Sequence, residues 1–539
     1  MTSTERDLRA EAEAWLADDP DPASQDELRA VLGTTAELAD RFAGPLRFGT
    51  AGLRGPLRAG PNGMNLAVVR GAAAGLVRWL AATGAEGPLV IGYDARHGSH
   101  AFAVETARVA TGAGRAALLL PRPLPTPVLA FAVRVKGAAA GVMVTASHNP
   151  PQDNGYKVYM ADGSQIVPPA DAGIEHAIRA VGPLAEVPLG PPGEVLTEDI
   201  VRAYVDRAVD VVDREVPRDL VVAYTPMHGV GRDVFLATVE QAGYPAPFVV
   251  AAQAEPDADF PTLAFPNPEE PGATDLLLAL ARESDADIAI ANDPDADRCA
   301  VAVKERDDWR LLRGDEVGAL LADHLMRRGV KGRYATTIVS SSLLSRMCQA
   351  RGLPYGETLT GFKWIVRAGD DLVYGYEEAL GYCVAPDMVR DKDGITAALL
   401  VCELAAGLKA EFRTLTDRLD ELAAQYGVHA TDQLSVRVED LTEISTAMAT
   451  IRRRPPAELL DEPVHAIEDR LPESDVLILR AGTTRVVVRP SGTEPKLKAY
   501  LEVVEPVAGG DVAAARAKAK AMLAALRTET ATALGLQGD

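Results

Sequence analysis

Short apolar runs and longer segments with helical spacing alternate along most of the chain. Residues 1–40 are polar with helical spacing and predict an N-terminal helical appendage. Beyond them, the apolar run at residues 88–93 ends in a polar turn, and residues 100–114 then show apolar positions every three or four residues. This order of strand, turn and helix predicts mostly parallel sheets covered by helices on both faces.

The same strand-and-turn pattern recurs along the rest of the chain, at residues 141–150, 219–233, 286–298, 335–344 and 371–382. Ligands in such folds gather at the carboxyl ends of the strands, so the turns that follow these strands are candidate sites. The end of the chain differs. Residues 483–505 predict two strands flanking a loop and residues 512–528 predict a helix, which together indicate an α+β domain with a more antiparallel sheet.

Length and composition indicate several domains in one chain. The 539 residues exceed the roughly 100–200 residues that usually share one core. Two stretches rich in proline and acidic residues, 181–198 and 252–271, are the predicted connectors. The length alone suggests about three to five domains.

Charge and hydropathy restrict the possible partners. The formal net charge of -22 argues against nucleic acid or an anionic membrane as partner. The chain begins with a polar segment, and no apolar run reaches the roughly 18 residues of a membrane span, so we predict a cytoplasmic protein. The four cysteines include no CxxC pair, so neither disulfides nor structural zinc is expected.

The segment DPDADR at residues 293–298 places three carboxylates at alternate positions, which an extended loop would point to one side. Clustered carboxylates repel one another unless a hard cation lies among them. An EF-hand calcium loop is excluded, because its sixth position is Arg298 instead of glycine and its twelfth is Lys304 instead of glutamate. A solvated acidic turn is the alternative. We expect Mg²⁺ to be bound by Asp293, Asp295 and Asp297.

The segment TASHNP at residues 145–150 follows a buried strand and offers a hydroxyl nucleophile, Ser147. Adjacent side chains at a strand end should point apart, and no GxSxG elbow surrounds Ser147 and His148, so a hydrolase triad is not indicated. A serine in an ordinary polar turn is the alternative. Lys157, in NGYK ten residues further on, supplies a cation that could return to the same site.

Several turns combine glycine with cations or hydroxyls, which is typical of phosphate binding. In VRPSGTEPK at residues 488–496, backbone amides and the side chains of Arg489, Ser491 and Thr493 can donate to phosphate oxygens. A basic hairpin turn is the alternative. Glu377 stands at a strand end, where it could accept hydrogen bonds from vicinal hydroxyls. No Walker motif and no convincing GxGxxG occur, so a nucleotide is not the expected anion. Other polar turns add Arg54, Arg96, Thr360, Gly361 and Lys392.

Together these motifs resemble the α-D-phosphohexomutase superfamily, which includes phosphoglucomutases and phosphomannomutases. The resemblance rests on six ordered motifs: FGTAGLRG at 48–55, TASHNP with NGYK at 145–157, DPDADR at 293–298, TGFK at 360–363, EEALG with RDKDG at 377–394, and RPSGTEPK at 489–496. It implies an α/β protein of four domains around a central cleft, three with related mixed α/β sheets and a C-terminal α+β domain. On this resemblance we expect the four domains to span residues 1–205, 206–310, 311–430 and 431–539.

The resemblance also implies roles for individual residues. Ser147 would be the phosphoserine donor, and one of its phosphoryl oxygens would join the three aspartates around one Mg²⁺ per chain. Lys157 would be the general acid/base, and His148 and Arg54 are further catalytic candidates. The sugar phosphate would be bound by Arg298, Thr360, Gly361, Glu377, Lys392, Arg489, Ser491, Gly492 and Thr493.

Two positions depart from the family pattern. Ala379 stands at the third position of the E-x-S sugar loop, and Met388 stands where some phosphoglucomutases have a histidine. Both changes resemble the branch that contains phosphopentomutases and bisphosphate-forming relatives.

We predict an intramolecular phosphotransferase that interconverts glucose 1-phosphate and glucose 6-phosphate, with glucose 1,6-bisphosphate as bound intermediate and activator. The intermediate would turn round between two transfers. Phosphomannomutase and phosphopentomutase are the alternatives with the same mechanism. A phosphatase using the same serine, or a non-catalytic sugar-phosphate-binding protein, are the alternatives of other classes. A monomer or homodimer is expected.

Overall fold

The computed structural model describes residues 3–49, 52–305, 308–437, 441–491 and 496–535. The chain divides into two compact units, one formed by Met1–Leu312 with Ala379–Ala410 and the other by Arg313–Glu378 with Glu411–Asp539. Each unit has sheets and a buried apolar core of its own.

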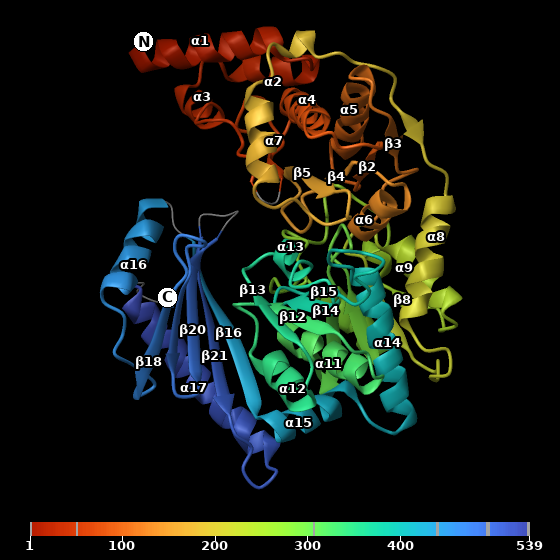
Figure 1. The fold of residues 1–539 in the computed structure, drawn as a ribbon, viewed down its shortest axis with the longest axis vertical. Helices are drawn as coiled ribbons and strands as arrows, with labels where there is room; N and C mark the ends of the chain where they lie inside the picture. The colour runs from red at the N-terminus through yellow and green to blue at the C-terminus, as the bar shows by residue number, and fades with distance from the viewer. Residues whose placement is uncertain (1–2, 50–51, 306–307, 438–440, 492–495, 536–539) are drawn as a thin grey trace. The chain divides into compact units, whose positions relative to one another are not determined.

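Three helices open the first unit, as the polar N-terminal pattern predicted (Figure 1). They are α1 (Ser3–Asp18), α2 (Pro22–Val31) and α3 (Thr35–Arg41). Helix α2 starts where the Asp21 side chain accepts a hydrogen bond from the backbone of Ala23. The three helices bury Ala12, Leu28 and Leu38 against Ala59, so the appendage packs onto the turn after β1.

The first sheet is mixed and has six strands in the order β1-β5-β4-β2-β3-β6. They are β1 (Leu53–Pro56), β2 (Leu89–Tyr93), β3 (Ala117–Leu119), β4 (Ala140–Val144), β5 (Asp153–Met160) and β6 (Glu194–Val195). β2 runs parallel to β3 and β4, whereas β5 runs antiparallel to β4 and β1. The helices of this part are α4 (Leu66–Ala82), α5 (Ser99–Gly112), α6 (Thr126–Val135) and α7 (Ala170–Arg179). α4 packs between α5 and α7 (Figure 1).

The second sheet of this unit is also mixed, with the order β11-β10-β9-β7-β8. Its strands are β7 (Val222–Thr225), β8 (Phe248–Val249), β9 (Ile288–Ala291), β10 (Ala300–Glu305) and β11 (Asp308–Leu311). Its helices are α8 (Asp199–Ala208), α9 (Arg232–Gln241) and α10 (Asp275–Glu283). The first unit also contains three short 3₁₀ turns, η1 (Leu184–Glu186), η2 (Val209–Val211) and η3 (Ala251–Gln253). β9 runs parallel to β7 and antiparallel to β10, so DPDADR forms the turn between two antiparallel strands.

The segment Ala379–Ala410 completes the first unit. It contains β15 (Gly381–Cys383) and α14 (Gly394–Ala410). Gly381 forms a backbone bridge with Arg298, which brings this segment to the DPDADR turn.

The second unit begins with three parallel strands, with β12 between the other two. They are β12 (Arg333–Thr337), β13 (Tyr355–Thr358) and β14 (Leu372–Glu377), and the helices around them are α11 (Gly314–Arg327), α12 (Leu343–Arg351), α13 (Phe362–Ile365) and α15 (Leu415–Tyr426). Because β14 ends at Glu377, the predicted sugar acceptor lies at a carboxyl end of this sheet.

The remaining sheet of the second unit is antiparallel throughout, in the order β16-β21-β20-β19-β18-β17. Its strands are β16 (Val428–Arg437), β17 (Glu458–Leu459), β18 (Glu462–Asp469), β19 (Leu477–Ala481), β20 (Thr484–Pro490) and β21 (Lys496–Glu505), and its helices are α16 (Leu441–Arg453) and α17 (Val512–Ala533) (Figure 1, blue). Alternate residues face opposite ways: Leu477 and Leu479 enter the core with α16 and α17, whereas Ile478 packs against Ile338 and Val339.

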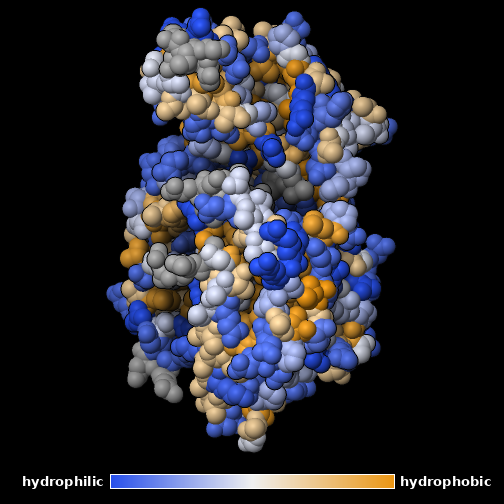
Figure 2. All heavy atoms as spheres, turned by 90° about the vertical axis from the view of Figure 1, so that its left-hand side faces the viewer, coloured by the Kyte–Doolittle hydropathy of each residue, from blue (hydrophilic) through white to orange (hydrophobic). Residues whose placement is uncertain are grey.

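The predicted fold class is confirmed: α/β sheets with covering helices are followed by an α+β part whose sheet is antiparallel. In the described part of the chain, no helix is long and apolar enough to cross a membrane. On the face drawn in Figure 2, hydrophobic side chains are interspersed among hydrophilic ones.

Candidate active site

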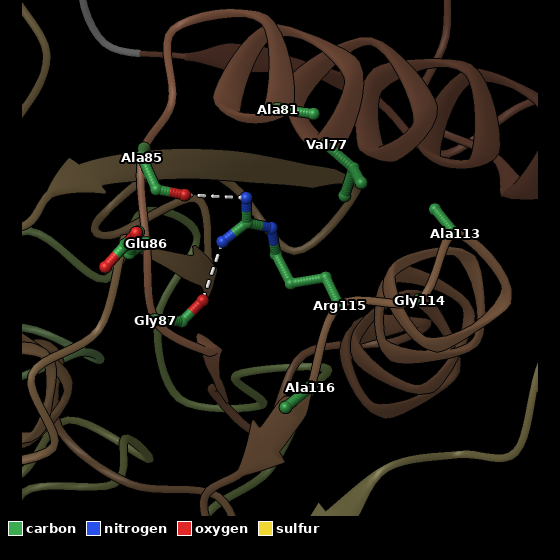
Figure 3. Close-up of a pocket in the computed structure, with 9 residues that line it drawn as sticks. All are labelled: Val77, Ala81, Ala85, Glu86, Gly87, Ala113, Gly114, Arg115 and Ala116. Carbon is green, nitrogen blue, oxygen red and sulfur yellow. Dashed lines mark hydrogen bonds between the residues drawn. The ribbon is translucent and has the colours of Figure 1, made fainter.

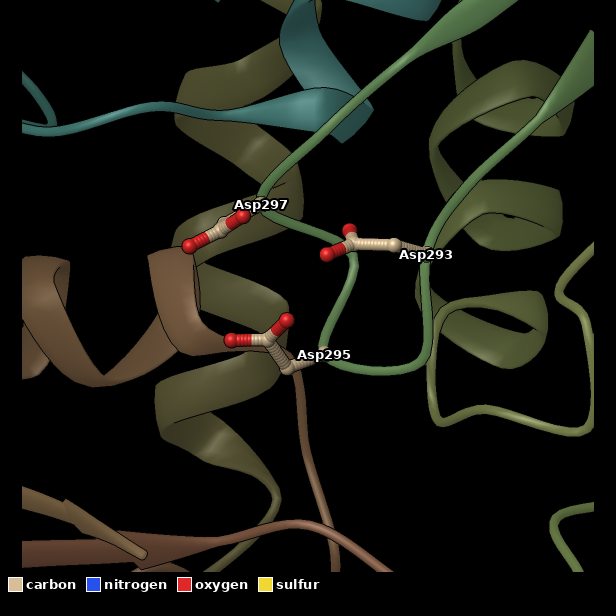
Figure 4. Close-up of side chains that lie close together, drawn as sticks. All are labelled: Asp293, Asp295 and Asp297. Atoms are coloured by element: carbon tan, nitrogen blue, oxygen red, sulfur yellow. The ribbon is translucent and has the colours of Figure 1, made fainter. Parts of the chain in front are cut away.

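Three aspartates converge from the turn between β9 and β10 (Figure 4). Each aspartate contributes one carboxylate oxygen to a cluster in which the three oxygens lie within 4.8 Å of one another. All three residues, Asp293, Asp295 and Asp297, are buried. The turn is not the extended loop that we expected from the alternation, because Ala296 has a φ of 53° and the chain folds back there. The carboxylates gather all the same.

Neighbouring groups donate hydrogen bonds to one oxygen of Asp295 and of Asp297 but not to the other. Oδ2 of Asp295 accepts from the hydroxyl of Thr126 at 2.6 Å and from Lys157 at 2.7 Å. Oδ2 of Asp297 lies 3.1 Å from Nζ of Lys157 and 3.2 Å from Nζ of Lys392. The Oδ1 atoms of both aspartates are buried and accept no hydrogen bond from any described residue.

This donor set fits a hard divalent cation. A buried carboxylate oxygen without a partner costs about 1–3 kcal/mol or more, because its hydration is lost without replacement. A divalent ion bound by oxygen ligands would satisfy both Oδ1 atoms and offset the repulsion between the three carboxylates. The three aspartates are the metal-ligand cluster found in the described part of the chain.

Burial and the surrounding charges act differently on the three carboxyl groups. Burial raises the pKa of Asp293 well above its usual value, and the charges of Asp295 and Asp297 raise it further. Burial also opposes ionisation of Asp297, but Lys157 and Lys392 outweigh it, so the pKa of Asp297 is lowered. Without a metal, the negative charge of the cluster therefore lies mainly on the carboxylate that the lysines contact and not on Asp293.

Ser147 lies in the turn after β4 and faces the aspartate turn. Its hydroxyl donates to Oδ2 of Asp293 at 2.8 Å, and its Oγ lies 3.2 Å from Nδ1 of His148. The prediction that Ser147 and His148 point apart is wrong, because Ser147 has a left-handed backbone with a φ of 53° instead of a strand conformation. Strained backbone of this kind often marks functional turns. Ser147 is only 3% exposed.

We expected Arg96 to be available for binding phosphate. Instead, its side chain holds the Ser147 turn. Its guanidinium donates to the backbone carbonyls of Ser147 at 2.7 Å, Asn149 at 2.6 Å and Pro150 at 2.8 Å. It also stacks on the ring of Phe260 at 4.9 Å. We therefore regard Arg96 as part of the scaffold of this turn.

Lys157 reaches the aspartates from β5, which is paired with β4. Burial alone would lower the pKa of Lys157, but the carboxylates of Asp295 and Asp297 raise it overall. The ammonium group of Lys157 therefore lies at the site, as the sequence suggested, and two carboxylates hold it there.

Two arginines border the same site. Arg54 donates to the side chain of Asn149 at 3.0 Å, and burial lowers its pKa although Asp295 opposes this. The backbone of Arg298 donates to Asp293 at 3.0 Å, and its guanidinium donates to the carbonyl of Ala379 at 2.7 Å. The burial of His148 and its nearness to Arg298 and Arg54 lower the pKa of this histidine well below its usual value.

The other predicted residues belong to the second unit. Glu377 ends β14, Thr360 and Gly361 lie in the turn before α13, and Arg489 and Ser491 lie at the end of β20. Gly492 and Thr493 lie outside the described residues.

The phosphate candidate Arg489 contacts a tyrosine of the second unit. Arg489 donates to the hydroxyl of Tyr500 at 3.4 Å. Burial raises the pKa of Tyr500, and the charges of Glu378 and Glu377 raise it further, while Arg489 opposes them. Glu378 itself accepts from the hydroxyls of Thr337 and Ser340 at 3.3 Å.

The sequence reasoning missed residues that hold the aspartate turn. Thr126 begins α6, 169 positions from Asp295, and its backbone and hydroxyl both donate to that residue. Gly229 packs against Pro294 so closely that a Cβ would lie 2.3 Å from the Cα of Pro294. The apolar strand followed by HGVG at residues 228–231 could have predicted the loop that contains Gly229. No local sequence pattern predicted the role of Thr126.

A separate hollow of about 340 Å³ lies away from these residues, between the end of α4 and β3 (Figure 3). Its one cation, Arg115, already donates to the carbonyls of Gly87 at 2.6 Å and Ala85 at 2.9 Å. None of the predicted site residues lines it.

Comparison with known proteins assigns most of the chain to one family. Residues 45–183, 202–306 and 313–426 match phosphoglucomutase/phosphomannomutase α/β/α domains I, II and III, and residues 436–519 match the C-terminal domain of the same family. The chain therefore belongs to the phosphoglucomutase/phosphomannomutase family, within the α-D-phosphohexomutase superfamily. It is a sugar-phosphate mutase, which is an isomerase.

Individual relatives carry different substrate names. A protein of Haemophilus influenzae named "Probable phosphomannomutase" is 45% identical, over 82% of this chain and 93% of its own. The phosphopentomutase of Mus musculus is 31% identical, over 94% and 91%. The phosphoglucomutase of Staphylococcus aureus is 32% identical, over 87% and 92%. The crystal structure of a putative phosphomannomutase from Thermus thermophilus is 26% identical with a TM-score of 0.71, and the match covers 89% of this chain and 99% of that one.

Proposed function

We propose that this enzyme interconverts glucose 1-phosphate and glucose 6-phosphate through a phosphorylated Ser147 and a bound glucose 1,6-bisphosphate. The observation that carries the proposal is the 2.8 Å contact between the Ser147 hydroxyl and Asp293. It joins the only serine of the TASHNP turn to a buried cluster that can hold a metal ion.

Mg²⁺ is the proposed metal, with Asp293, Asp295, Asp297 and an oxygen on Ser147 as its ligands. A phosphoserine adds a charge of about −1.5 to −2 beside three carboxylates, so the site needs a counter-charge. Bound Mg²⁺ would neutralise charge on the transferred phosphoryl group. The all-oxygen donor set suits a hard cation, and Mg²⁺ is chosen because it needs few protein carboxylates and takes further oxygens from phosphate.

The reaction consists of two phosphoryl transfers with the same chemistry in opposite directions. In the first, the bond between phosphorus and Oγ of Ser147 breaks, and a bond forms to the free hydroxyl of the sugar monophosphate. Lys157, our acid/base candidate, has a raised pKa and starts protonated; it would give a proton to the leaving Oγ of Ser147 and in turn take up the proton of the sugar hydroxyl. After the bisphosphate turns round, its other phosphoryl group returns to Ser147 by the reverse chemistry.

The remaining candidates bind and orient the sugar phosphate in this proposal. Arg489, Ser491, Gly492 and Thr493 would hold the phosphate that is not transferred, and Glu377 would accept from sugar hydroxyls. The sugar phosphate would also meet Arg298, Thr360, Gly361 and Lys392, and Arg54 and His148 are further catalytic candidates beside Ser147. Local cations of this kind would allow phosphate to bind to a chain with a net charge of -22.

Mannose and pentose phosphates are the alternative substrates, favoured by the relatives from Haemophilus influenzae and Mus musculus. The relative from Staphylococcus aureus supports glucose. We further propose the four-domain division near residues 205, 310 and 430. The cytoplasmic location and the monomeric or dimeric state stay predictions from the sequence.

The test is a panel of glucose, mannose and ribose 1-phosphates, each assayed with a trace of glucose 1,6-bisphosphate. We expect the highest kcat/KM with glucose 1-phosphate and no release of inorganic phosphate. A higher kcat/KM with mannose or ribose 1-phosphate would assign the substrate to that sugar. Free phosphate appearing as fast as the substrate disappears would contradict a mutase.

A further inference from the structure

Lys392 is held beside the aspartate turn by buried contacts that lead back to β5. Its Nζ lies 3.2 Å from Oδ2 of Asp297 and 3.5 Å from Oδ1 of Asp391. The other oxygen of Asp391 accepts a hydrogen bond from the Tyr159 hydroxyl at 2.8 Å and one from the Gln165 amide at 2.8 Å. The position of Lys392 is therefore linked to Tyr159 through one carboxylate.

Tyr159 and Lys157 stand two positions apart on β5, so their side chains leave the same face of the strand. Lys157 donates at 3.1 Å to Oδ2 of Asp297, the same oxygen that Lys392 contacts. The contacts thus form a closed circuit, which runs from Lys157 through Asp297, Lys392 and Asp391 and returns to β5 at Tyr159. One strand fixes both ends of it.

The circuit is buried, which makes its geometry costly to disturb. Asp297 and Tyr159 are 0% exposed, Asp391 is 1% exposed and Lys392 is 6% exposed. Hydrogen bonds are stronger in such surroundings, and an unpaired polar group costs more. Burial and the charge of Asp391 raise the pKa of Tyr159 well above its usual value, so the phenol stays a donor.

We propose that Tyr159 is a positioning residue, which acts through Asp391 to fix the ammonium group of Lys392 beside Asp297. Tyr159 does not touch the sugar phosphate in this account. Its effect on the reaction passes through Lys392, which meets the substrate in the proposed function. The inference rests on the proposed function for its kinetic readout.

Tyr204 on α8 offers a matched control, because its partner Asp393 lies on the same segment as Lys392. Its hydroxyl donates to the two oxygens of Asp393 at 2.8 and 2.9 Å, and it is also 0% exposed. Asp393 accepts from the backbone of Ile395 at 3.0 Å and of Thr396 at 3.1 Å, at the start of α14. Removing the Tyr204 hydroxyl therefore disturbs a buried tyrosine–aspartate bond that supports a helix start next to Lys392, but it keeps the hydroxyl of Tyr159 on Asp391.

The experiment compares Tyr159→Phe and Tyr204→Phe in the full chain, by kcat/KM and by thermal unfolding. Each variant loses one buried hydrogen bond, so both melting temperatures should fall by a similar amount. We expect kcat/KM to fall about tenfold or more in Tyr159→Phe and to stay within about twofold in Tyr204→Phe. In a Lys392→Met background, Tyr159→Phe should change kcat/KM by less than about twofold, because the residue through which it acts is gone.

Three results would overturn the positioning role. They are an unchanged kcat/KM in Tyr159→Phe, equal losses in the two Phe variants, and a loss in the Lys392→Met background as large as in the wild type. If Tyr159→Phe does not fold, Gln165→Leu removes the other donor to the same oxygen and is judged by the same criteria. A wild-type chain without mutase activity would refute the proposed function instead, which separates the two failures.

Discussion

Replacing Thr126 by valine should weaken Mg²⁺ binding although Thr126 is not a proposed ligand. Thr126 is fully buried at the start of α6. Its hydroxyl donates to Oδ2 of Asp295 at 2.6 Å, and its backbone nitrogen donates to the carbonyl of Asp295 at 2.9 Å. Valine has nearly the same shape, so Thr126→Val removes the hydroxyl and keeps the backbone contact.

The size of the effect follows from what remains around Asp295. A hydrogen bond to a charged group contributes about 1.5–3 kcal/mol. Groups that orient metal ligands typically change affinity about 10–100-fold when they are removed. Lys157 still holds the same oxygen at 2.7 Å, so the orientation is only partly lost. We therefore expect the lower end of the range, about a tenfold loss or 1.4 kcal/mol.

The assay is calorimetric titration of the unphosphorylated protein with Mg²⁺. The matched control is Thr238→Val, since Thr238 is also fully buried and its hydroxyl donates at 2.8 Å to Val234 of its own helix. Both variants should lose some stability in urea, but only Thr126→Val should bind Mg²⁺ more weakly. Unchanged affinity in Thr126→Val, or an equal loss in Thr238→Val, would refute the reasoning.

Two further predictions concern the second unit. Arg489→Ala should raise KM for the sugar phosphate about tenfold or more, because a charge-assisted contact to phosphate is lost. An unchanged KM in steady-state assays would contradict the proposal that Arg489 holds the phosphate that is not transferred. Burial raises the pKa of Asp315 to about 7, so the folded protein keeps a proton that the unfolded chain releases above about pH 4. Stability should then fall as pH rises from about 4 to about 7. Asp315→Asn should reduce the difference between urea midpoints at pH 5 and pH 8, and an undiminished difference would argue against the raised pKa.

The sequence predicted the site best where a local pattern carries the chemistry. Alternating carboxylates in DPDADR indicated a cluster, since three acids so close need a cation. The buried strands before TASHNP and DPDADR were recognisable as apolar runs, and both turns follow strand ends. The α+β end of the chain was also predicted, because 483–505 contains two apolar runs flanking a polar loop, as two paired strands do.

Contacts that depend on backbone strain or on distant segments could not be predicted in this way. The left-handed φ of Ser147 turns its side chain toward His148, which a strand rule forbids. The carbonyl groups that accept hydrogen bonds from Arg96 come together only once the Ser147 turn has folded around it, so no local sequence pattern predicts these bonds. Thr126 meets Asp295 across 169 positions, and a lone threonine at a helix start carries no signal for a metal site.

The most direct test of the account is the covalent state of Ser147. The protein is incubated with glucose 1,6-bisphosphate labelled on phosphorus, and its intact mass and the labelled peptide are determined by mass spectrometry. The account predicts one phosphoryl group on the peptide that contains Ser147, and loss of both the label and turnover in a folded Ser147→Ala variant. A turning-over enzyme with no phosphate on Ser147, or an active Ser147→Ala variant, would contradict it.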